Sequence, residues 1–145
     1  MKASSYPFVP KSTASLRRGQ FWAIPLQDGS FGAGCVVGRC IDDASGKVSS
    51  RYFIAAVLNW HGSGEPTASQ LEGVSPVSCA FAHIKAITTS GKFILGEANT
   101  VLHGLPEEAR SLSMSTWGYG VPTLLAAKLA SGQDKAAKSS FDYSG

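Results

Sequence analysis

The sequence predicts a mainly β protein: a single antiparallel, strongly bent sheet or a small, partly open β-barrel of about five or six strands, with a C-terminal α-helix. Three observations predict this fold class. Apolar residues alternate with a period of two in several stretches. An Asp-Gly pair at residues 28–29 separates two of these stretches, which is typical of a β-hairpin. Glycines 32, 34 and 38 share one face of the second stretch, where they let a strand bend and another backbone approach.

The first three strands are expected to form a meander. Residues 20–26 alternate, and residues 31–41 return from the Asp-Gly turn as the second strand. Pro25 has no N–H to donate, so we expect the first strand to lie at an edge or to contain a bulge. The third strand is expected over residues 47–61. Its apolar residues occupy both faces, which predicts a strand covered on two sides.

The later elements are shorter. We expect one helical turn over residues 67–72, a fourth strand over 78–88 and a fifth over 92–97. Residues 106–110 resemble a helix start, because proline comes first and two glutamates follow near the positive end of the helix dipole.

The C-terminal helix is predicted from Pro122 in its first turn, an apolar stripe of Leu124, Leu125 and Leu129, and Gly132 as its stop. The chain is therefore divided into an extended arm over residues 1–15, one globular β-rich domain over 16–132 and a flexible tail over 133–145.

Composition bounds the function. The net charge of +3 comes from scattered basic residues, so nucleic acid is not the expected partner. The sequence has three cysteines, and such a low and odd number argues against a disulfide framework. We therefore expect free thiols and a cytoplasmic location. The sequence has no apolar run long enough to cross a membrane and no signal peptide, so we expect no contact with a membrane.

Residues for catalysis or metal binding are present without the required surroundings. Cys35 and Cys79 lie in apolar strands, where a free cysteine is a small buried hydrophobe rather than an activated nucleophile. The spacing of cysteines, histidines and acids matches no metal site, and Gly32-Ala33-Gly34 lies within a hairpin instead of a phosphate-binding loop. We therefore expect no catalytic residue, no metal and no cofactor.

Two aromatic segments are the candidates for binding a partner. Trp60 and His61 end the third strand, and Trp117 and Tyr119 alternate with glycines before the C-terminal helix. Such side chains offer large, rigid contact areas, which suits anchors in a protein interface. The alternative is that the tryptophans close the ends of the core, since large aromatics serve packing first.

A resemblance to a known family supplies the leading hypothesis. It rests on Arg18-Gly19-Gln20-Phe21-Trp22-Ala23-Ile24-Pro25-Leu26, Asp28-Gly29 and Val36-Val37-Gly38, and on the later Ala82-His83-Ile84-Lys85, Ile94-Leu95-Gly96 and Trp117-Gly118-Tyr119. Over residues 16–120 the chain resembles the immunity protein 26 family, whose members are predicted bacterial immunity proteins of polymorphic toxin systems. The resemblance implies a protein that neutralises a cognate toxin by stoichiometric protein–protein binding.

Two other functions are kept open. A nucleic-acid or small-ligand binding module on a small β-barrel requires exposed Trp or Phe in one groove with Arg17, Arg18, Arg39 and Arg51. A hydrolase requires a histidine within hydrogen-bond reach of a cysteine.

Overall fold

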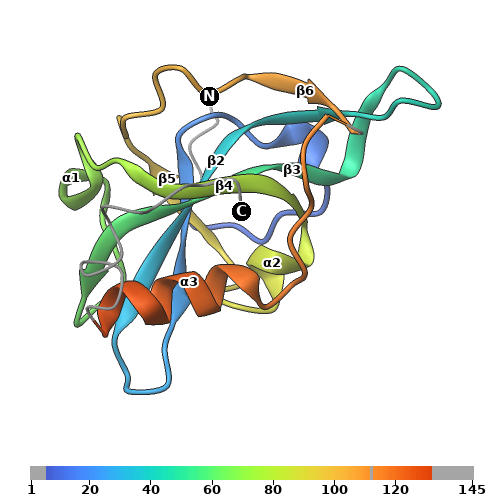
Figure 1. Cartoon of the computed structure of the whole chain (residues 1–145). Helices are drawn as coiled ribbons and strands as arrows, with labels where there is room; N and C mark the ends of the chain where they lie inside the picture. The colour runs from blue at the N-terminus through green and yellow to red at the C-terminus, as the bar shows by residue number, and fades with distance from the viewer. Residues whose placement is uncertain (1–5, 112, 132–145) are drawn as a thin grey trace.

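The computed structural model describes residues 6–111 and 113–131, and the expected tail at 133–145 lies outside them. The chain contains the elements η1 (Thr13–Ser15), β1 (Gln20–Pro25), β2 (Phe31–Ile41), β3 (Val48–Gly62), α1 (Ala68–Leu71), β4 (Pro76–His83), α2 (Lys85–Thr88), β5 (Ile94–Glu97), β6 (Glu108–Arg110) and α3 (Val121–Ala130). Five strands form an open antiparallel sheet in the order β4-β3-β2-β1-β5, and β6 joins β2 in parallel (Figure 1). The predicted bent sheet with a C-terminal helix is confirmed, and it is not closed into a barrel.

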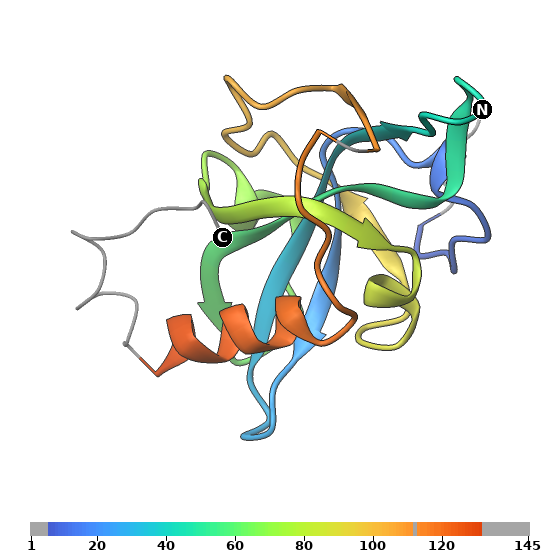
Figure 2. The same ribbon diagram turned by 45° about the vertical axis from the view of Figure 1, so that its right-hand side comes forward.

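The predicted hairpin and meander are present. β1 pairs with β2 from Phe21↔Cys35 to Pro25↔Phe31, and Gly29 has a φ of +88° in the turn between them. The expectation that β1 lies at an edge or contains a bulge is wrong: β1 lies between β2 and β5, and the irregularity opposite Phe21 and Trp22 places the extra residue, Leu95, in β5. Pro25 is accommodated because it lies beyond the residues of β1 that pair with β5. Figure 2 shows this hairpin extending past α3 at the lower end of the molecule.

Both faces of the sheet are covered, as the sequence of β3 predicts. One face carries the helix-side cluster, covered by η1, α2 and α3: Leu16, Trp22, Ile24, Val36, Phe53, Ala55, Val57, Ala80, Ala82, Ala86, Ile87, Ile94, Trp117 and Ala126. The other carries the loop-side cluster, covered by α1 and the segment after β5: Phe21, Ala33, Cys35, Val37, Cys40, Ile54, Ala56, Leu58, Leu71, Phe81, Ala98 and Leu102. Consecutive residues of β3 contribute to opposite clusters because side chains alternate across a strand.

The glycine face of β2 lies on the helix side and admits bulky neighbours. A Cβ on Gly32 would lie 2.6 Å from the Ala126 Cβ, and a Cβ on Gly34 would meet the Trp22 ring. The small residues therefore bring α3 and the largest core side chain against the backbone of β2.

The predicted fourth strand is too long. β4 ends at His83, and residues 85–88 form the short helix α2. The ladder between β4 and β3 stops at this point, although β3 itself continues back to Val48. The ladder with β3 ends at Tyr52↔His83, and the Ile84 N–H donates instead to the Arg51 carbonyl. The helical turn also buries the neighbouring residues Ala86 and Ile87 on the same side, which a strand does not do.

The predicted helix start at residues 106–110 is wrong. Residues 108–110 form β6, and the Arg39 N–H donates to the Glu107 carbonyl at 2.8 Å. Gly38 permits this approach, because any Cβ there would collide with the Glu107 backbone. A proline followed by two acids is a local signal, and a neighbouring strand overrides it.

The C-terminal helix is confirmed, but its packing face differs from the predicted stripe. Pro122 and Ala126 are buried and Leu125 packs on the helix-side cluster, whereas Leu124 is 63% exposed. The contact between Ala126 and Gly32 fixes this rotation of the helix. Gly132, the predicted stop, lies outside the described residues, and α3 ends at Ala130.

Candidate functional site

The four predicted binding residues do not form one site. Trp60 and His61 lie at the end of β3, where His61 pairs with Gly32 of the hairpin. Trp60 is half-buried against the loop-side cluster, and Trp117 is buried in the helix-side cluster. Tyr119 is 50% exposed just before α3 and belongs to a different neighbourhood from Trp60 and His61. Trp117 thus fills the core, and its neighbour Tyr119 reaches the surface.

Tyr119 is part of a surface patch that no pattern in the sequence predicts. Tyr52 and His83 are cross-strand partners of β3 and β4, and their rings lie 5.1 Å apart at 83°. The His83 ring lies 5.2 Å from the Tyr119 ring. We call Tyr52, His83 and Tyr119, with the flanking Arg51 and Lys85, the tyrosine–histidine patch. Three chain segments far apart in sequence thus present a continuous aromatic surface.

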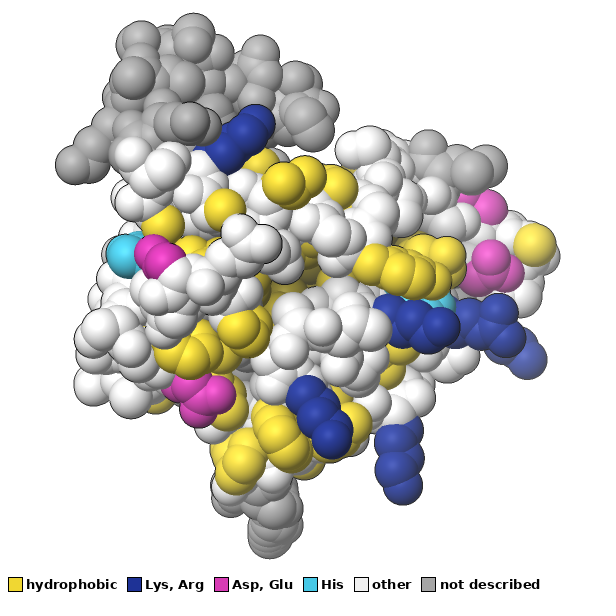
Figure 3. Space-filling model, turned by 90° about the horizontal axis from the view of Figure 1, so that it is seen from below, with side chains coloured by type: hydrophobic (Ala, Val, Ile, Leu, Met, Phe, Trp, Pro, Cys, Tyr) yellow, Lys and Arg dark blue, Asp and Glu magenta, His cyan; other side chains and the backbone are white. Residues whose placement is uncertain are grey.

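The patch is positively charged at its rim. The Lys85 ammonium lies 5.8 Å from the centre of the Tyr119 ring. Burial lowers the pKa of His83, and the charges of Lys85 and Arg51 lower it further. Figure 3, which views the molecule from below, shows Lys and Arg side chains beside hydrophobic side chains on that face. His83 is therefore neutral at pH 7, and the patch takes its charge from the two cations.

The backbone hydrogen bond of Lys85 orients the His83 ring. The Lys85 N–H donates to His83 Nδ1 at 3.1 Å. In a neutral ring, an accepting Nδ1 leaves the proton on Nε2. No residue of the described segments accepts a hydrogen bond from this Nε2. The ring thus offers a hydrogen-bond donor between the two tyrosines.

Side-chain to backbone bonds hold the start of β3 in place. The Thr13 hydroxyl is buried and lies 2.8 Å from the carbonyl oxygens of both Ser49 and Tyr52. Ser49 Oγ in turn accepts the N–H groups of Arg51 and Tyr52. These bonds fix the backbone beneath Tyr52 and give the patch a defined position on the scaffold.

Backbone pairing to β4 holds the segment that carries Tyr119. The Phe81 N–H donates to the Ser115 carbonyl at 3.0 Å, and the Trp117 N–H donates to the Phe81 carbonyl at 2.8 Å. Because Trp117 is anchored in the core, the position of Tyr119, two residues further along the chain, is restricted. The patch therefore rests on rigid structure at each of its three rings.

His61 belongs to a polar cluster at the hairpin turn. Ser30 Oγ lies 2.8 Å from His61 Nε2 and 2.5 Å from Asp28 Oδ1. In a catalytic triad the carboxylate binds the second nitrogen of the histidine and orients it as a base. Here the carboxylate binds the serine, and the bonds from Ser30 lower the pKa of Asp28. The arrangement stabilises the turn and does not activate the serine.

The cysteine thiols are unsuited to nucleophilic attack. Burial raises the pKa of Cys35 to about 11 and that of Cys79 to about 11, and it also raises the pKa of Cys40. Cys79 and His103 line the same cavity of about 430 Å³, but no hydrogen bond joins them in the described chain. Thiols of such high pKa stay protonated at neutral pH. Among the described residues, no group of three His, Cys, Asp or Glu is placed to hold a metal ion.

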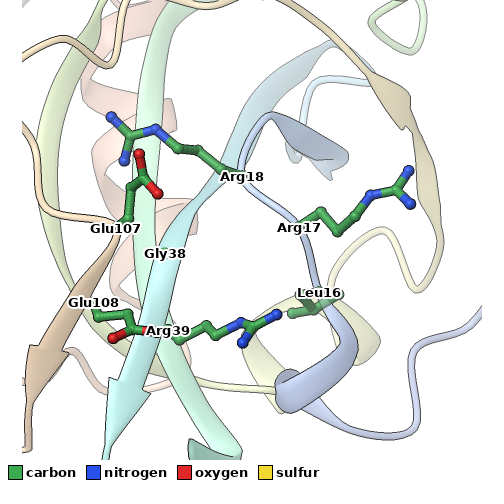
Figure 4. Close-up of a pocket in the computed structure, with 7 residues that line it drawn as sticks. All are labelled: Leu16, Arg17, Arg18, Gly38, Arg39, Glu107 and Glu108. Carbon is green, nitrogen blue, oxygen red and sulfur yellow. The ribbon is translucent and has the colours of Figure 1, made fainter.

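Three of the four arginines considered for nucleic-acid binding line one cavity. Arg17, Arg18 and Arg39 surround a space of about 500 Å³ with Leu16, Gly38, Glu107 and Glu108 (Figure 4). Arg18 donates to the carbonyls of Val37 and Leu102, and Arg17 pairs with Glu97 at 2.8 Å. Arg51 lies instead at the tyrosine–histidine patch. Among the described residues, no Trp or Phe lines this cavity and two glutamates do, so this lining lacks the stacking surface that the nucleic-acid hypothesis requires.

Comparison with known proteins adds no relative. No protein-family model matches the chain, and neither curated proteins nor solved structures give a significant match. Within the described residues, no helix is long and apolar enough to cross a membrane. The geometry of the patch and the resemblance in the sequence are therefore the features that bear on function.

Proposed function

We propose that this protein is an immunity-type protein of the cytoplasm that neutralises a cognate bacterial toxin by stoichiometric binding through the tyrosine–histidine patch. The observation that carries the proposal is the pair of exposed tyrosines, 38% and 50% accessible, that contact His83 on a fixed backbone. Tyrosine is among the residues that dominate binding energy in protein interfaces, because it brings a large contact area at low entropic cost.

The charge of the patch specifies the surface of the partner. Neither Lys85 nor Arg51 forms an ion pair in the described part of the chain. The charges that shift the His83 pKa are these two cations, with no carboxylate beside them in that part of the chain. An acidic surface on the toxin domain would complement them and accelerate association. The net charge of +3 favours the same kind of partner over the basic cleft of a nuclease.

The test requires a cognate toxin domain, and the proposal expects its gene to lie beside the gene for this protein. Tyr119→Ala should weaken binding by about 2 kcal/mol or more while the thermal midpoint stays near the wild-type value, because Tyr119 is exposed. Phe93→Ala is the matched control, since Phe93 is also exposed, carries Lys92 over its ring at 5.7 Å, and has no ring contact with the patch in the described residues. Titration calorimetry measures both variants.

Stoichiometry separates binding from catalysis. Protection by a binding protein saturates at a fixed molar ratio to the toxin. Toxin inactivation that continues at substoichiometric amounts would refute the proposal and favour an enzyme. Equal losses for Tyr119→Ala and Phe93→Ala would place the interface elsewhere and refute the assignment of the patch.

A nucleic-acid or small-ligand binding module is the second candidate, and one feature of the patch favours it. Exposed aromatic rings beside cations can stack bases and attract phosphates. Fluorescence anisotropy with a labelled single-stranded oligonucleotide tests it. Affinity that falls steeply with salt and is lost in Tyr119→Ala would support this function over toxin binding.

A further inference from the structure

His83 presents one oriented hydrogen-bond donor at the centre of the tyrosine–histidine patch. Its ring centroid lies 5.1 Å from that of Tyr52 and 5.2 Å from that of Tyr119, so aromatic rings flank it on two sides. Its Nδ1 accepts the Lys85 N–H at 3.1 Å, which fixes the ring and leaves the proton of the neutral imidazole on Nε2. Since Nε2 has no acceptor among the described residues, a ligand that satisfies it carries an acceptor oxygen.

Two exposed cations accompany this donor. The Lys85 ammonium, at the start of α2, lies 5.8 Å from the centre of the Tyr119 ring. Arg51 lies on β3 and is close enough for its charge to lower the pKa of His83. Neither cation forms an ion pair within the described segments, and no carboxylate there contributes to the shift of the His83 pKa. The patch thus gathers a hydrogen-bond donor and two positive charges from three elements without a counterion.

A donor beside two cations is the chemistry of an oxyanion site. A carboxylate accepts hydrogen bonds on both oxygens and is bound more strongly by charged donors than a neutral carbonyl is. The partner in the proposed function is a protein, and the oxyanion that an unmodified protein surface offers is the side chain of aspartate or glutamate. We propose that His83, Lys85 and Arg51 together bind one such carboxylate of the partner, with the two tyrosine rings beside it. This inference rests on the proposed function and names His83 as the residue that makes the patch selective for an acid.

The probe is glutamate acetylated at its amino end and amidated at its carboxyl end, so that it carries a single carboxylate. Its titration into isotope-labelled protein, at constant ionic strength kept with sodium chloride, should give saturable NMR shifts at His83 and Lys85. The capped glutamine analogue keeps an acceptor oxygen but has no charge, so it should bind at least about threefold more weakly. Equal affinities for the two probes, or equal shifts at the exposed His103 outside the patch, would refute the site.

The charge state of His83 provides a readout that adhesion elsewhere on the protein does not move. Burial lowers its pKa, and the charges of Lys85 and Arg51 lower it further; the two tyrosines are the other titratable groups that face the ring. A carboxylate at Nε2 favours the charged imidazole, so saturating capped glutamate should raise the pKa of His83. By linkage, affinity should then increase as the pH falls below 7. A His83 pKa that is the same with and without the probe, measured from its ring NMR signals, would overturn the proposal.

Matched variants test the donor and the charge separately. His83→Phe keeps a ring between the tyrosines and removes both nitrogens, so binding of capped glutamate should weaken at least about fivefold. Lys85→Gln should weaken it roughly two- to fivefold, which is the effect of losing an exposed ion pair. Lys92→Gln is the control, since Lys92 also lies over an aromatic ring, 5.7 Å from that of Phe93, and should leave the affinity unchanged. With thermal midpoints showing that each variant is folded, equal effects of the two lysine changes, or full binding by His83→Phe, would refute the assignment.

Other sources of an oxyanion are distinguished by the same titration. Dimethyl phosphate that binds more tightly than capped glutamate would overturn the carboxylate and favour the nucleic-acid module. N-acetylalanine carries only a terminal carboxylate, and tighter binding of this probe would overturn the assignment to a side chain. None of these probes requires the toxin. Failure of the carboxylate site is therefore seen in the probe titrations, and failure of the proposed function is seen separately in toxin binding by Tyr119→Ala.

Discussion

At the scale of single residues, the glycines of the first hairpin have two different roles. Gly29 has a φ of +88° and open space around it, so its role is conformational. Gly34 has no such φ, but a Cβ there would meet the indole of Trp22. One position requires a left-handed backbone and the other requires the absence of a side chain.

Gly29→Val should destabilise the protein by more than ~1 kcal/mol, because a β-branched residue is strained at positive φ. A Cβ at this position meets no atom within 4 Å, so the loss comes from the backbone alone. Gly29→Asn should restore most of the stability, since asparagine tolerates this conformation. Denaturant unfolding measures both variants, and equal midpoints for them would contradict the assignment.

Gly34→Ala should destabilise the protein by about 1–3 kcal/mol, because the added methyl group overpacks the core against Trp22. Gly64→Ala is the control, since a Cβ on Gly64 meets nothing within 4 Å. The unfolding midpoints of the two variants check this. Equal midpoints would show that Trp22 can move aside without loss.

The buried thiol of Cys35 should make stability fall at alkaline pH. Its pKa rises from 9.0 to about 11 on folding, so the folded state keeps its proton more firmly than the unfolded state. The stabilisation is complete below about pH 9 and is lost as pH rises towards 11. Cys35→Ala should remove this share of the slope, as measured by chemical unfolding at several pH values. An unchanged slope in the variant would mean that the thiol is not desolvated.

At the scale of elements, Trp117 and Tyr119 show how one short segment serves the core and the surface. Trp117→Ala should lower stability by ~3–5 kcal/mol, because its side chain belongs to the helix-side cluster. Tyr119→Ala should change stability by less than ~0.5 kcal/mol, because its side chain is half exposed. Thermal unfolding of the two variants distinguishes the roles, and similar losses would contradict them.

The elements also show what the sequence can predict. The period of two, the Asp-Gly turn and the glycine face were sufficient for β1, β2 and β3, because these signals are local and agree with the packing on both faces. The end of β4 and the identity of β6 depend on which residues find a backbone partner in a distant strand. No local signal encodes that information.

The site was predictable only in part for the same reason. Tyr119 was identified because an aromatic between glycines is conspicuous in the sequence. Tyr52 and His83 are 31 positions apart, and only the register of β3 with β4 brings them together. The pairing of Tyr52 with His83 could have been predicted only from the register between β3 and β4. The irregular pairing at Val57 and Leu58 obscures that register.

At the scale of the whole molecule, β3 joins the two apolar clusters into one structure. Phe53, Ala55 and Val57 pack on the helix side, and the residues alternating with them pack on the loop side. Neither cluster has a sheet of its own. Loss of packing on one face therefore removes the support of the other.

This arrangement predicts a single cooperative unfolding transition. Val57→Ala and Leu58→Ala alter neighbouring residues on opposite faces, and both side chains are fully buried. Each change should lower the midpoint of the same transition, with Leu58→Ala costing about 2–5 kcal/mol. Circular dichroism and tryptophan fluorescence should give coincident curves for both variants, because the sheet and the buried Trp22 are lost together. Separate transitions for the two probes would show that the clusters unfold independently.

If unfolding is a single transition, a toxin bound at the tyrosine–histidine patch should raise its midpoint. The reason is that a ligand bound to the folded state stabilises the whole unit that unfolds cooperatively.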